Sequence, residues 1–255
     1  MEVAAAQRQL QRQASAPHGL RARGAAPPRL PHRRRCRCAA AGAAAEGAPQ
    51  AAPAAAAVVA LKEWAPTCAA LGAGEQTILI RKGGIKEPKF VPEAAAFLLF
   101  PTSFHTDQQL LKPGAASKYR EALDLDPKQL PAVPLAQYAE VTGAWTTRDE
   151  RVLQVLSPLH VWADAFRDTR LKWRRAQPLT LLELRAYRLE PPLQLPRCEE
   201  LFGCFSWVGT PGLAPEAVAA AVARRVPALG DAAFAERQAL LRERLASLEA
   251  EPLAL

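Results

Sequence analysis

Two histidines and two aspartates are the side chains of this chain best suited to metal chemistry. His160 and Asp164 are four residues apart, and on a predicted helix over residues 158–168 they would share one face. His105 and Asp107 follow a predicted strand end, where functional loops are common. Together the four could bind a divalent metal through two nitrogens and two oxygens. The alternative is structural, with the second histidine packed or capping a helix and its aspartate paired with a nearby arginine.

The carboxylates fit a magnesium-dependent nuclease poorly. Such an enzyme needs an acid on one strand and Glu-x-Lys on the next, so that two carboxylates hold Mg²⁺ and the lysine activates water. Residues 87–89 read Glu-Pro-Lys, but proline disturbs a central strand. Residues 183–185 read Glu-Leu-Arg, where arginine stays protonated. Nucleophile-elbow, P-loop and dinucleotide motifs are missing, and no motif indicates a specific cofactor. Catalysis is therefore the less favoured interpretation.

The positive charge is concentrated near the N-terminus. Residues 1–45 hold nine of the 33 Lys+Arg and one of the 25 Asp+Glu, which leaves 24 of each sign for residues 46–255. An Arg-rich, Ala-rich, acid-poor leader is typical of an organelle-import presequence. We predict a plastid transit peptide over residues 1–38 and a location in the chloroplast stroma, with the mitochondrion as the alternative. An Ala/Pro-rich linker is expected over residues 39–57, and no apolar run is long enough for a transmembrane segment.

Three cysteines follow the predicted leader: Cys68, Cys198 and Cys204. An odd, small number in a reducing compartment favours free thiols over a disulfide framework. The last two are too far apart for a CxxC pair and lack a second pair for zinc. We expect them to be structural.

Periodicity and turn residues predict an α+β domain over residues 58–210, with a small mixed or barrel-like β-sheet and flanking helices. Strands are expected at 76–82, 96–100, 135–146, 179–189 and 205–208, and helices at 58–71, 117–123, 148–156 and 158–168. Pro101 is expected to end the second strand because proline cannot donate to a ladder. Thr106 and Gln109 fit a capping box for a short helix after it.

A C-terminal helical hairpin is predicted over residues 213–255, with helices at 215–226 and 231–249. Leucines and a phenylalanine at heptad spacing give its second helix one apolar stripe. We favour packing of this hairpin back onto the domain over a partner helix, although a protein partner through residues 213–255 remains an alternative.

Four sequence blocks resemble an uncharacterised family known as domain of unknown function 1802 (DUF1802). The blocks are Leu61-Lys62-Glu63-Trp64, the run from Gln76 to Ile85, Phe97-Leu98-Leu99-Phe100-Pro101-Thr102 with His105, and Gly203-Cys204-Phe205-Ser206-Trp207-Val208. The resemblance covers about residues 58–210 and implies no established activity.

The opening segment is also similar in outline to small β-barrel RNA-associated domains of the PUA and ASCH type. That similarity implies a basic, aromatic-edged cleft that contacts phosphates and stacks bases. Its side chains would be Arg81, Lys82, Lys86 and Lys89, with a second cluster of Arg170, Lys172 and Trp173 followed by two further arginines. The alternative is that these residues are solvated faces of a neutral domain, which lacks the net field typical of nucleic-acid binders.

The sequence thus favours a non-catalytic binding module for nucleic acid or another anionic ligand. A metal-dependent nuclease or hydrolase is one alternative, and an assembly factor acting through its C-terminal helices is the other.

Overall fold

The computed structural model describes residues 58–83, 89–103, 107–168 and 177–254. The strands are β1 (Val59–Trp64), β2 (Ile78–Lys82), β3 (Ala96–Thr102), β4 (Ala132–Thr147), β5 (Leu179–Pro196), β6 (Trp207–Gly209), β7 (Val226–Pro227) and β8 (Ala250–Pro252). The α-helices are α1 (Ala65–Gly72), α2 (Pro113–Lys118), α3 (Arg120–Asp124), α4 (Val152–Val155), α5 (Asp164–Phe166), α6 (Pro215–Ala223) and α7 (Asp231–Leu245). The 3-10 turns are η2 (Gln108–Leu110), η3 (Pro127–Gln129), η4 (Ser157–Leu159) and η6 (Glu199–Leu201). The predicted transit peptide and linker lie outside these ranges.

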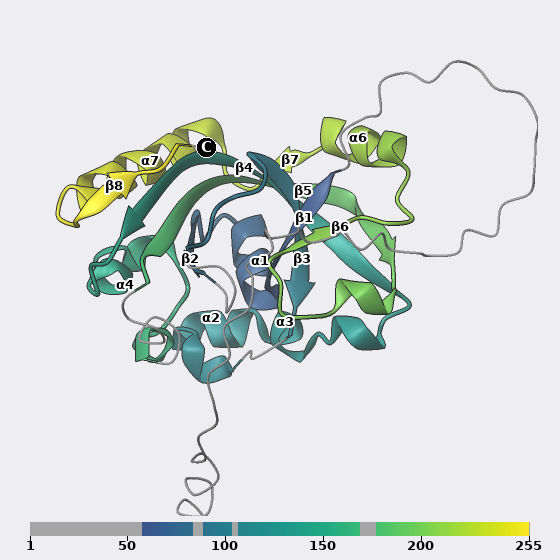
Figure 1. Ribbon diagram of the computed structural model, residues 1–255, viewed down its shortest axis with the longest axis horizontal. Helices are drawn as coiled ribbons and strands as arrows, with labels where there is room; N and C mark the ends of the chain where they lie inside the picture. The colour runs from purple at the N-terminus through teal and green to yellow at the C-terminus, as the bar shows by residue number, and fades with distance from the viewer. Residues whose placement is uncertain (1–57, 84–88, 104–106, 169–176, 255) are drawn as a thin grey trace, which may run out of the picture. The chain divides into compact units, whose positions relative to one another are not determined.

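The strands of the described residues form one sheet in the order β2-β5-β4-β3-β1-β6, with β7 beside β5 and β8 beside β4. β1 and β3 are parallel, and the other pairs are antiparallel. Figure 1 shows β4 and β5 arching over α1, with α7 and β8 at one end of the arch and α6 at the other. The predicted α+β class, a mixed sheet with flanking helices, is confirmed.

The arch follows from irregularities in the β4–β5 pairing. The register shifts between Leu135 and Gln137 and again between Val141 and Gly143. Such bulges bend a strand and increase its twist. Gly143 at the second shift leaves room for the Trp145 ring, since a Cβ there would lie 2.3 Å from that ring in its present position. The two longest strands therefore curl the sheet.

This curl brings strands from opposite ends of the sheet together. Arg81 of β2 donates through Nη1 to the backbone carbonyl of Lys62 and to the Glu63 carboxylate on β1, and through Nη2 to the hydroxyl of Ser206, next to β6. The Arg81 side chain thus bridges a seam that no backbone ladder closes among the described residues. The result is the open counterpart of a small barrel.

Apolar side chains fill the inside of the curl. Leu71 and Cys68 of α1 pack there with Leu61, Phe97 and Leu184 from three strands. The helix covers the concave side of the sheet, and residues of η6 and α6 cover the opposite face of β1 and β3. Strands buried on both sides carry continuous apolar runs.

The first predicted helix, over residues 58–71, is wrong in its first half, where the chain forms β1. Apolar residues there are buried on both sides: Ala60 joins the cluster outside the curl and Leu61 the cluster inside it. The helix begins only at Ala65, and Pro66 occupies its first turn, a position that suits proline.

Two other local predictions are corrected. Pro101 does not end its strand, because β3 pairs with β4 only through Leu98 and beyond that point needs no donor on that side. The predicted helix over residues 158–168 is broken, since His160 is extended (φ −147°, ψ 164°) between η4 and α5.

Both predicted C-terminal helices form and pack back onto the domain, at different places. Val218 of α6 joins the outer cluster with Phe100. Leu241 and Leu245 of α7 join the cluster around Trp162. Between the helices, β7 pairs with β5, and after them β8 pairs with β4. The C-terminal segment is thus built into the main sheet.

Candidate functional site

The carboxyl end of β1 carries two buried charged residues after an apolar run. Lys62 is 9% exposed and Glu63 is 7% exposed. Successive strand residues face opposite sides of a sheet, so the two side chains diverge. Lys62 points toward the loop between η6 and β6, whereas Glu63 points to the seam and binds Arg81.

The Lys62 ammonium is held by backbone oxygens and aromatic rings. Its Nζ donates to the carbonyl oxygens of Leu201 (3.0 Å) and Gly203 (2.9 Å). It also lies 4.3 Å from the ring centroid of Phe205 and 5.7 Å from that of Phe100. An ammonium has three N–H donors, so these bonds leave one for a further acceptor. We call Lys62, Gly203, Cys204 and Phe205 the Lys62 site.

The charge of Lys62 has no carboxylate partner within the described part of the chain. Burial lowers the pKa of Lys62 to about 8; the neighbouring Cys204 thiol opposes this shift and the neighbouring Lys128 adds to it. Lysines are almost never this deeply buried unless they are paired. The site is therefore electropositive, and an added negative charge would stabilise it.

Phe205 makes the outer wall of the Lys62 site. Its side chain is 44% exposed, and it is the aromatic residue among the exposed large apolar residues of the described ranges. The ring lies against Gly203, where a Cβ would sit 2.4 Å from a ring carbon. A glycine is thus required for the ring to lie in this position over the lysine.

The seam on the other side of β1 is a paired network. Arg81 Nη1 lies 2.8 Å from Glu63 Oε2, Arg81 Nη2 lies 3.1 Å from Ser206 Oγ, and the Arg81 guanidinium lies 5.1 Å from the Phe90 ring centroid. The second Glu63 oxygen accepts from the backbone N–H of Trp64. With its charge paired, this network serves to hold the curled sheet together.

The sequence-predicted cations separate in the structure. Arg81 is committed to the seam, and Lys82 is partly buried, which lowers its pKa. Lys89 is half-buried beyond β2. Lys86 lies outside the described residues, as do Arg170, Lys172 and Trp173 of the second predicted cluster. The structure thus does not bring the predicted set together as a single cleft within the ranges that it describes.

The predicted metal ligands have other tasks. Both ring nitrogens of His160 are used: Nε2 contacts the Leu153 carbonyl (2.8 Å), and Nδ1 accepts from the backbone N–H of Trp162 (3.1 Å). Asp107 accepts from the backbone N–H of Gln109 and caps η2, so it takes the role predicted for Thr106.

The helical part of the metal-site prediction is corrected as well. Asp164 begins α5, while His160 lies before that helix, so the two do not share a helical face. His105 lies outside the described residues. Among the residues that are described, no three His, Cys, Asp or Glu side chains form a group able to hold a metal ion.

The Glu-Leu-Arg segment on β5 is also accounted for structurally. Glu183 is 1% exposed and accepts from Thr142 Oγ1, Gln238 Nε2 and both terminal nitrogens of Arg242. Arg185 pairs with Asp231 at the start of α7. Both charged residues therefore fasten α7 to the sheet.

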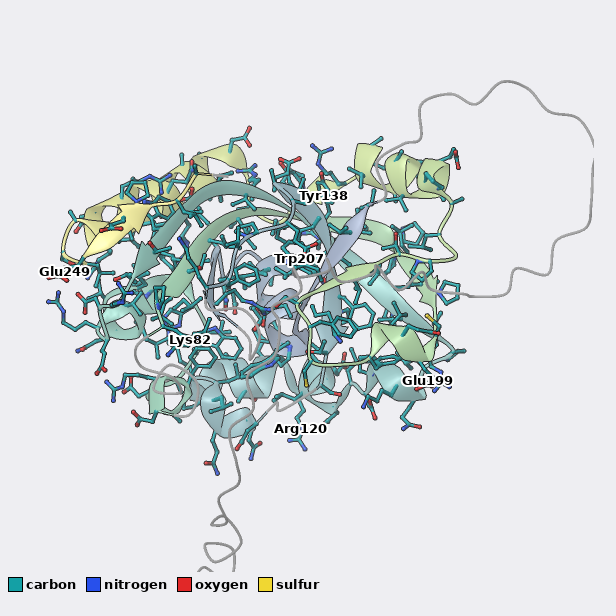
Figure 2. The ribbon with its side chains drawn as sticks, viewed as in Figure 1. Lys82, Arg120, Tyr138, Glu199, Trp207 and Glu249 are labelled. Carbon is teal, nitrogen blue, oxygen red and sulfur yellow. The ribbon has the colours of Figure 1, made fainter. Side chains whose placement is uncertain are left out.

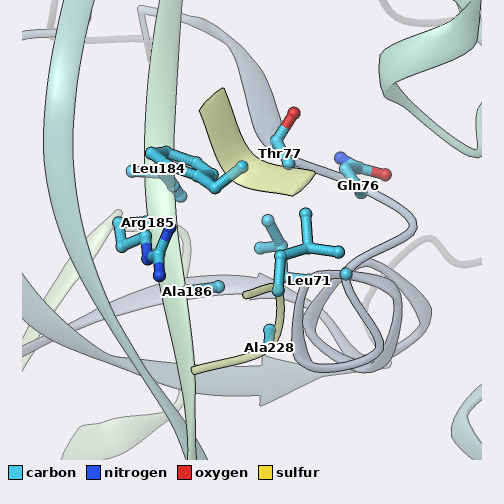
Figure 3. A pocket seen from close by; sticks show the side chains of 10 residues that line it. Leu71, Gln76, Thr77, Leu184, Arg185, Ala186 and Ala228 are labelled. Atoms are coloured by element: carbon cyan, nitrogen blue, oxygen red, sulfur yellow. The ribbon is translucent and has the colours of Figure 1, made fainter. Parts of the chain in front are cut away.

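Figure 3 shows a small cavity beside this attachment, where α1, β5 and the β7–α7 turn meet. Its empty volume is about 180 Å³ and is partly open to solvent; the lining is mainly apolar, with Arg185, Gln76 and Thr77 as polar residues. Pockets for drug-sized ligands measure about 300–1,000 Å³. This cavity is too small for such a ligand.

Comparison with known families decides where the chain belongs. Residues 60–240 match the family described as "Domain of unknown function (DUF1802)". The chain belongs to the DUF1802 family. This match confirms the predicted resemblance and extends it into α7. None of the curated proteins compared with the chain matches it.

Solved structures similar to this DUF1802 chain come from Zymomonas mobilis. A mutant of ZmASCH has a TM-score of 0.39 and 14% identity, covering 67% of this chain and 99% of that chain. The structure described as ASCH from the same organism has a TM-score of 0.37 and 12% identity, covering 66% of this chain and 94% of that chain. These scores are too low to assign the fold or a ligand. Within the described ranges of the DUF1802 chain, no helix combines the length and apolar character needed to cross a bilayer.

The predicted site of this DUF1802 chain did not include the residues that form the Lys62 site and the seam beside it. Lys62 and Glu63 interrupt an apolar run, which is the signal for buried charge in a strand. The predicted helix over residues 58–71 gave neither residue a role. Phe205 and Ser206 lie in a block that carried the family resemblance, but nothing in the sequence indicates that they meet β1.

Proposed function

We propose that this DUF1802 chain is a non-catalytic binding module for an anionic ligand, which supplies the counter-charge of Lys62. The observation that carries the proposal is a nearly buried ammonium held by two carbonyl oxygens without a carboxylate partner in the described residues.

The neighbouring Glu63–Arg81 pair supports this assignment by contrast. Arg81 and Glu63 satisfy one another across the seam. Lys62 is nearly as buried as Glu63. Burial lowers the pKa of Lys62, the neighbouring Cys204 opposes this shift, and a second cation, Lys128, adds to it. An uncompensated buried charge is costly in a fold. Perturbed residues of this kind cluster at functional sites. A phosphate or carboxylate beside Lys62 would offset the free-energy cost of burying its charge.

Nucleic acid and other polyanions are the ligand class that suits such a site. A polyanion binds with an affinity that falls as salt rises, because bound cations are released. Removing one lysine contact should lower the salt slope by about one. Inorganic polyphosphate of defined length is the simplest probe, since it offers phosphate charge without bases.

The test compares Lys62→Gln with Arg120→Gln by titrating labelled polyphosphate across a salt series. Arg120 on α3 is a matched control, because its side chain is 70% exposed, points to solvent (Figure 2) and forms an exposed ion pair with Asp124. We expect Lys62→Gln to weaken binding severalfold with a shallower salt slope, and the control to bind like the parent. Equal affinity and slope for both variants would show that Lys62 only pins its loop.

The proposal also sets a pH dependence. An anionic ligand favours the charged form of Lys62, whose pKa in the free protein is about 8, with Lys128 and Cys204 as its ionisable neighbours. Affinity should therefore be greatest below pH 8 and decline as the pH rises above it. In the Lys62→Gln variant this decline should shrink, and a decline of the same size in both proteins would assign it to another group.

A further inference from the structure

An exposed aromatic ring is fixed beside the buried charge of the Lys62 site. One side of the Phe205 ring faces the Lys62 ammonium at 4.3 Å from the ring centroid, and the side chain is 44% exposed. Cations are attracted to the face of an aromatic ring. The buried ammonium thus orients the ring from below, and the exposed surface remains available to a flat partner.

The backbone beneath the ring is shaped for this position. The absent side chain of Gly203 is what allows the ring to lie there, since an added Cβ would overlap the ring at 2.4 Å. Lys62 Nζ also binds the Gly203 carbonyl, which ties this backbone to β1. The ring, the glycine and the lysine therefore form one preorganised platform, so little side-chain freedom remains to be lost on binding.

We propose that the ligand of this site is single-stranded nucleic acid, with one unpaired base stacked on Phe205 and a neighbouring phosphate beside Lys62. This inference rests on the proposed function and names its ligand class. Aromatic stacking with cations along the backbone is the general mode of single-strand binding and tolerates any base. A duplex presents its phosphates but keeps its bases stacked in the helix, so it cannot use the ring.

An acidic peptide is the competing macromolecule, because it too would neutralise Lys62. It offers no flat π face for the ring, so Phe205 would contribute little beyond apolar contact. A nucleotide accounts for both features, since its phosphate would neutralise Lys62 and its base would stack on Phe205. An acidic peptide accounts for the charge alone.

The test uses the full chain and four probes of matched length: a labelled oligothymidine strand, the same strand with abasic sites, a duplex, and polyglutamate. Phe205→Leu keeps an apolar side chain but removes the aromatic face, and Gly203→Ala keeps the ring but displaces it. Val226→Ala is the control, because Val226 is an exposed apolar residue (37%) on β7. Far-UV circular dichroism checks that each variant is folded.

We expect Phe205→Leu to weaken binding of the intact strand by about fivefold to a hundredfold, the range for one stacked base. Gly203→Ala should weaken it in the same direction. Neither variant should alter binding of the abasic strand, and Val226→Ala should bind every probe like the parent.

Two results overturn the inference. In the first, the parent binds the intact and abasic strands with equal affinity. In the second, the parent binds polyglutamate or the duplex as tightly as it binds the intact strand, and Phe205→Leu does not change that affinity. In both, salt-dependent binding of polyphosphate that is weakened by Lys62→Gln would still uphold the proposed function. Failure of the proposed function looks different, since neither polyphosphate nor the abasic strand would then bind in a manner sensitive to Lys62→Gln.

Discussion

The ion pair between Glu183 and Arg242 should be a principal attachment of α7 to the sheet. Glu183 on β5 is 1% exposed and receives two bonds of 3.0 Å from the Arg242 guanidinium. That guanidinium also lies 4.7 Å from the Trp145 ring centroid. Arg242→Met keeps a flexible apolar side chain over the tryptophan and removes only the charged head. The variant therefore isolates the electrostatic part of the contact.

The expected loss follows from the burial of each partner. Breaking a fully buried ion pair costs about 3–5 kcal/mol, because one charge stays behind. Arg242 is 46% exposed, so water reaches the vacated position and moderates the loss. Thr142 and Gln238 continue to donate to the carboxylate. We expect Arg242→Met to lower the free energy of unfolding by about 2–3 kcal/mol.

Urea denaturation followed by tryptophan fluorescence measures this loss, and Arg120→Met provides the comparison. Arg120 and Asp124 are 70% and 67% exposed, so that variant should change stability by less than about 0.5 kcal/mol. A double-mutant cycle of Arg242→Met with Glu183→Gln should give a coupling energy of at least about 1 kcal/mol. A loss from Arg242→Met no larger than that of the surface control would refute the assignment of Glu183 as the anchor of α7.

Three further outcomes are expected. Burial lowers the pKa of His160 to about 4, below its unfolded value, so stability should fall by at most about 3 kcal/mol between pH 6.5 and 4, and His160→Gln should remove that part of the urea-denaturation profile. Cys204 is exposed and Cys68 is buried with a raised pKa, so mass spectrometry after brief alkylation should find the label on Cys204 and on Cys68 only after denaturation. Residues 1–57 fused to a fluorescent protein should direct it to plastids; a cytosolic signal would disprove the leader, and a mitochondrial one would favour the alternative.

The sequence predicted elements best where local pattern and tertiary burial agreed. The β4 prediction, 135–146, lies within the observed strand, because alternating side chains there serve opposite faces. The prediction for β5 stopped at 189, before prolines at 191 and 192. The observed strand continues through them because they fall at a register shift, where a ladder donor is dispensable.

Local pattern failed where tertiary contacts decided the outcome. The spacing that suggested a helix over residues 58–71 arises because β1 is buried on both faces and α1 follows it at once. The seam contact of Arg81, one member of the predicted cationic cleft, has a related cause. Arg81 lies at the end of β2, and only the curl of β4 and β5 determines that it meets Glu63. Such a contact depends on how far the whole sheet curls, which the pattern of neighbouring residues in the sequence does not indicate.

The Glu63–Arg81 ion pair across the seam also explains why function is assigned to Lys62 and not to Arg81. A methionine at position 62 could fill the space between Phe100 and Phe205 and would lose the two hydrogen bonds to the Leu201 and Gly203 carbonyls, whereas removing Arg81 would leave the Glu63 carboxylate without its partner charge. The charge of Arg81 is thus paired with a carboxylate within the described part of the fold, and that of Lys62 is not. A buried charge without a carboxylate partner is best understood through a ligand, and the exposed ring beside it favours a ligand that also offers a flat face.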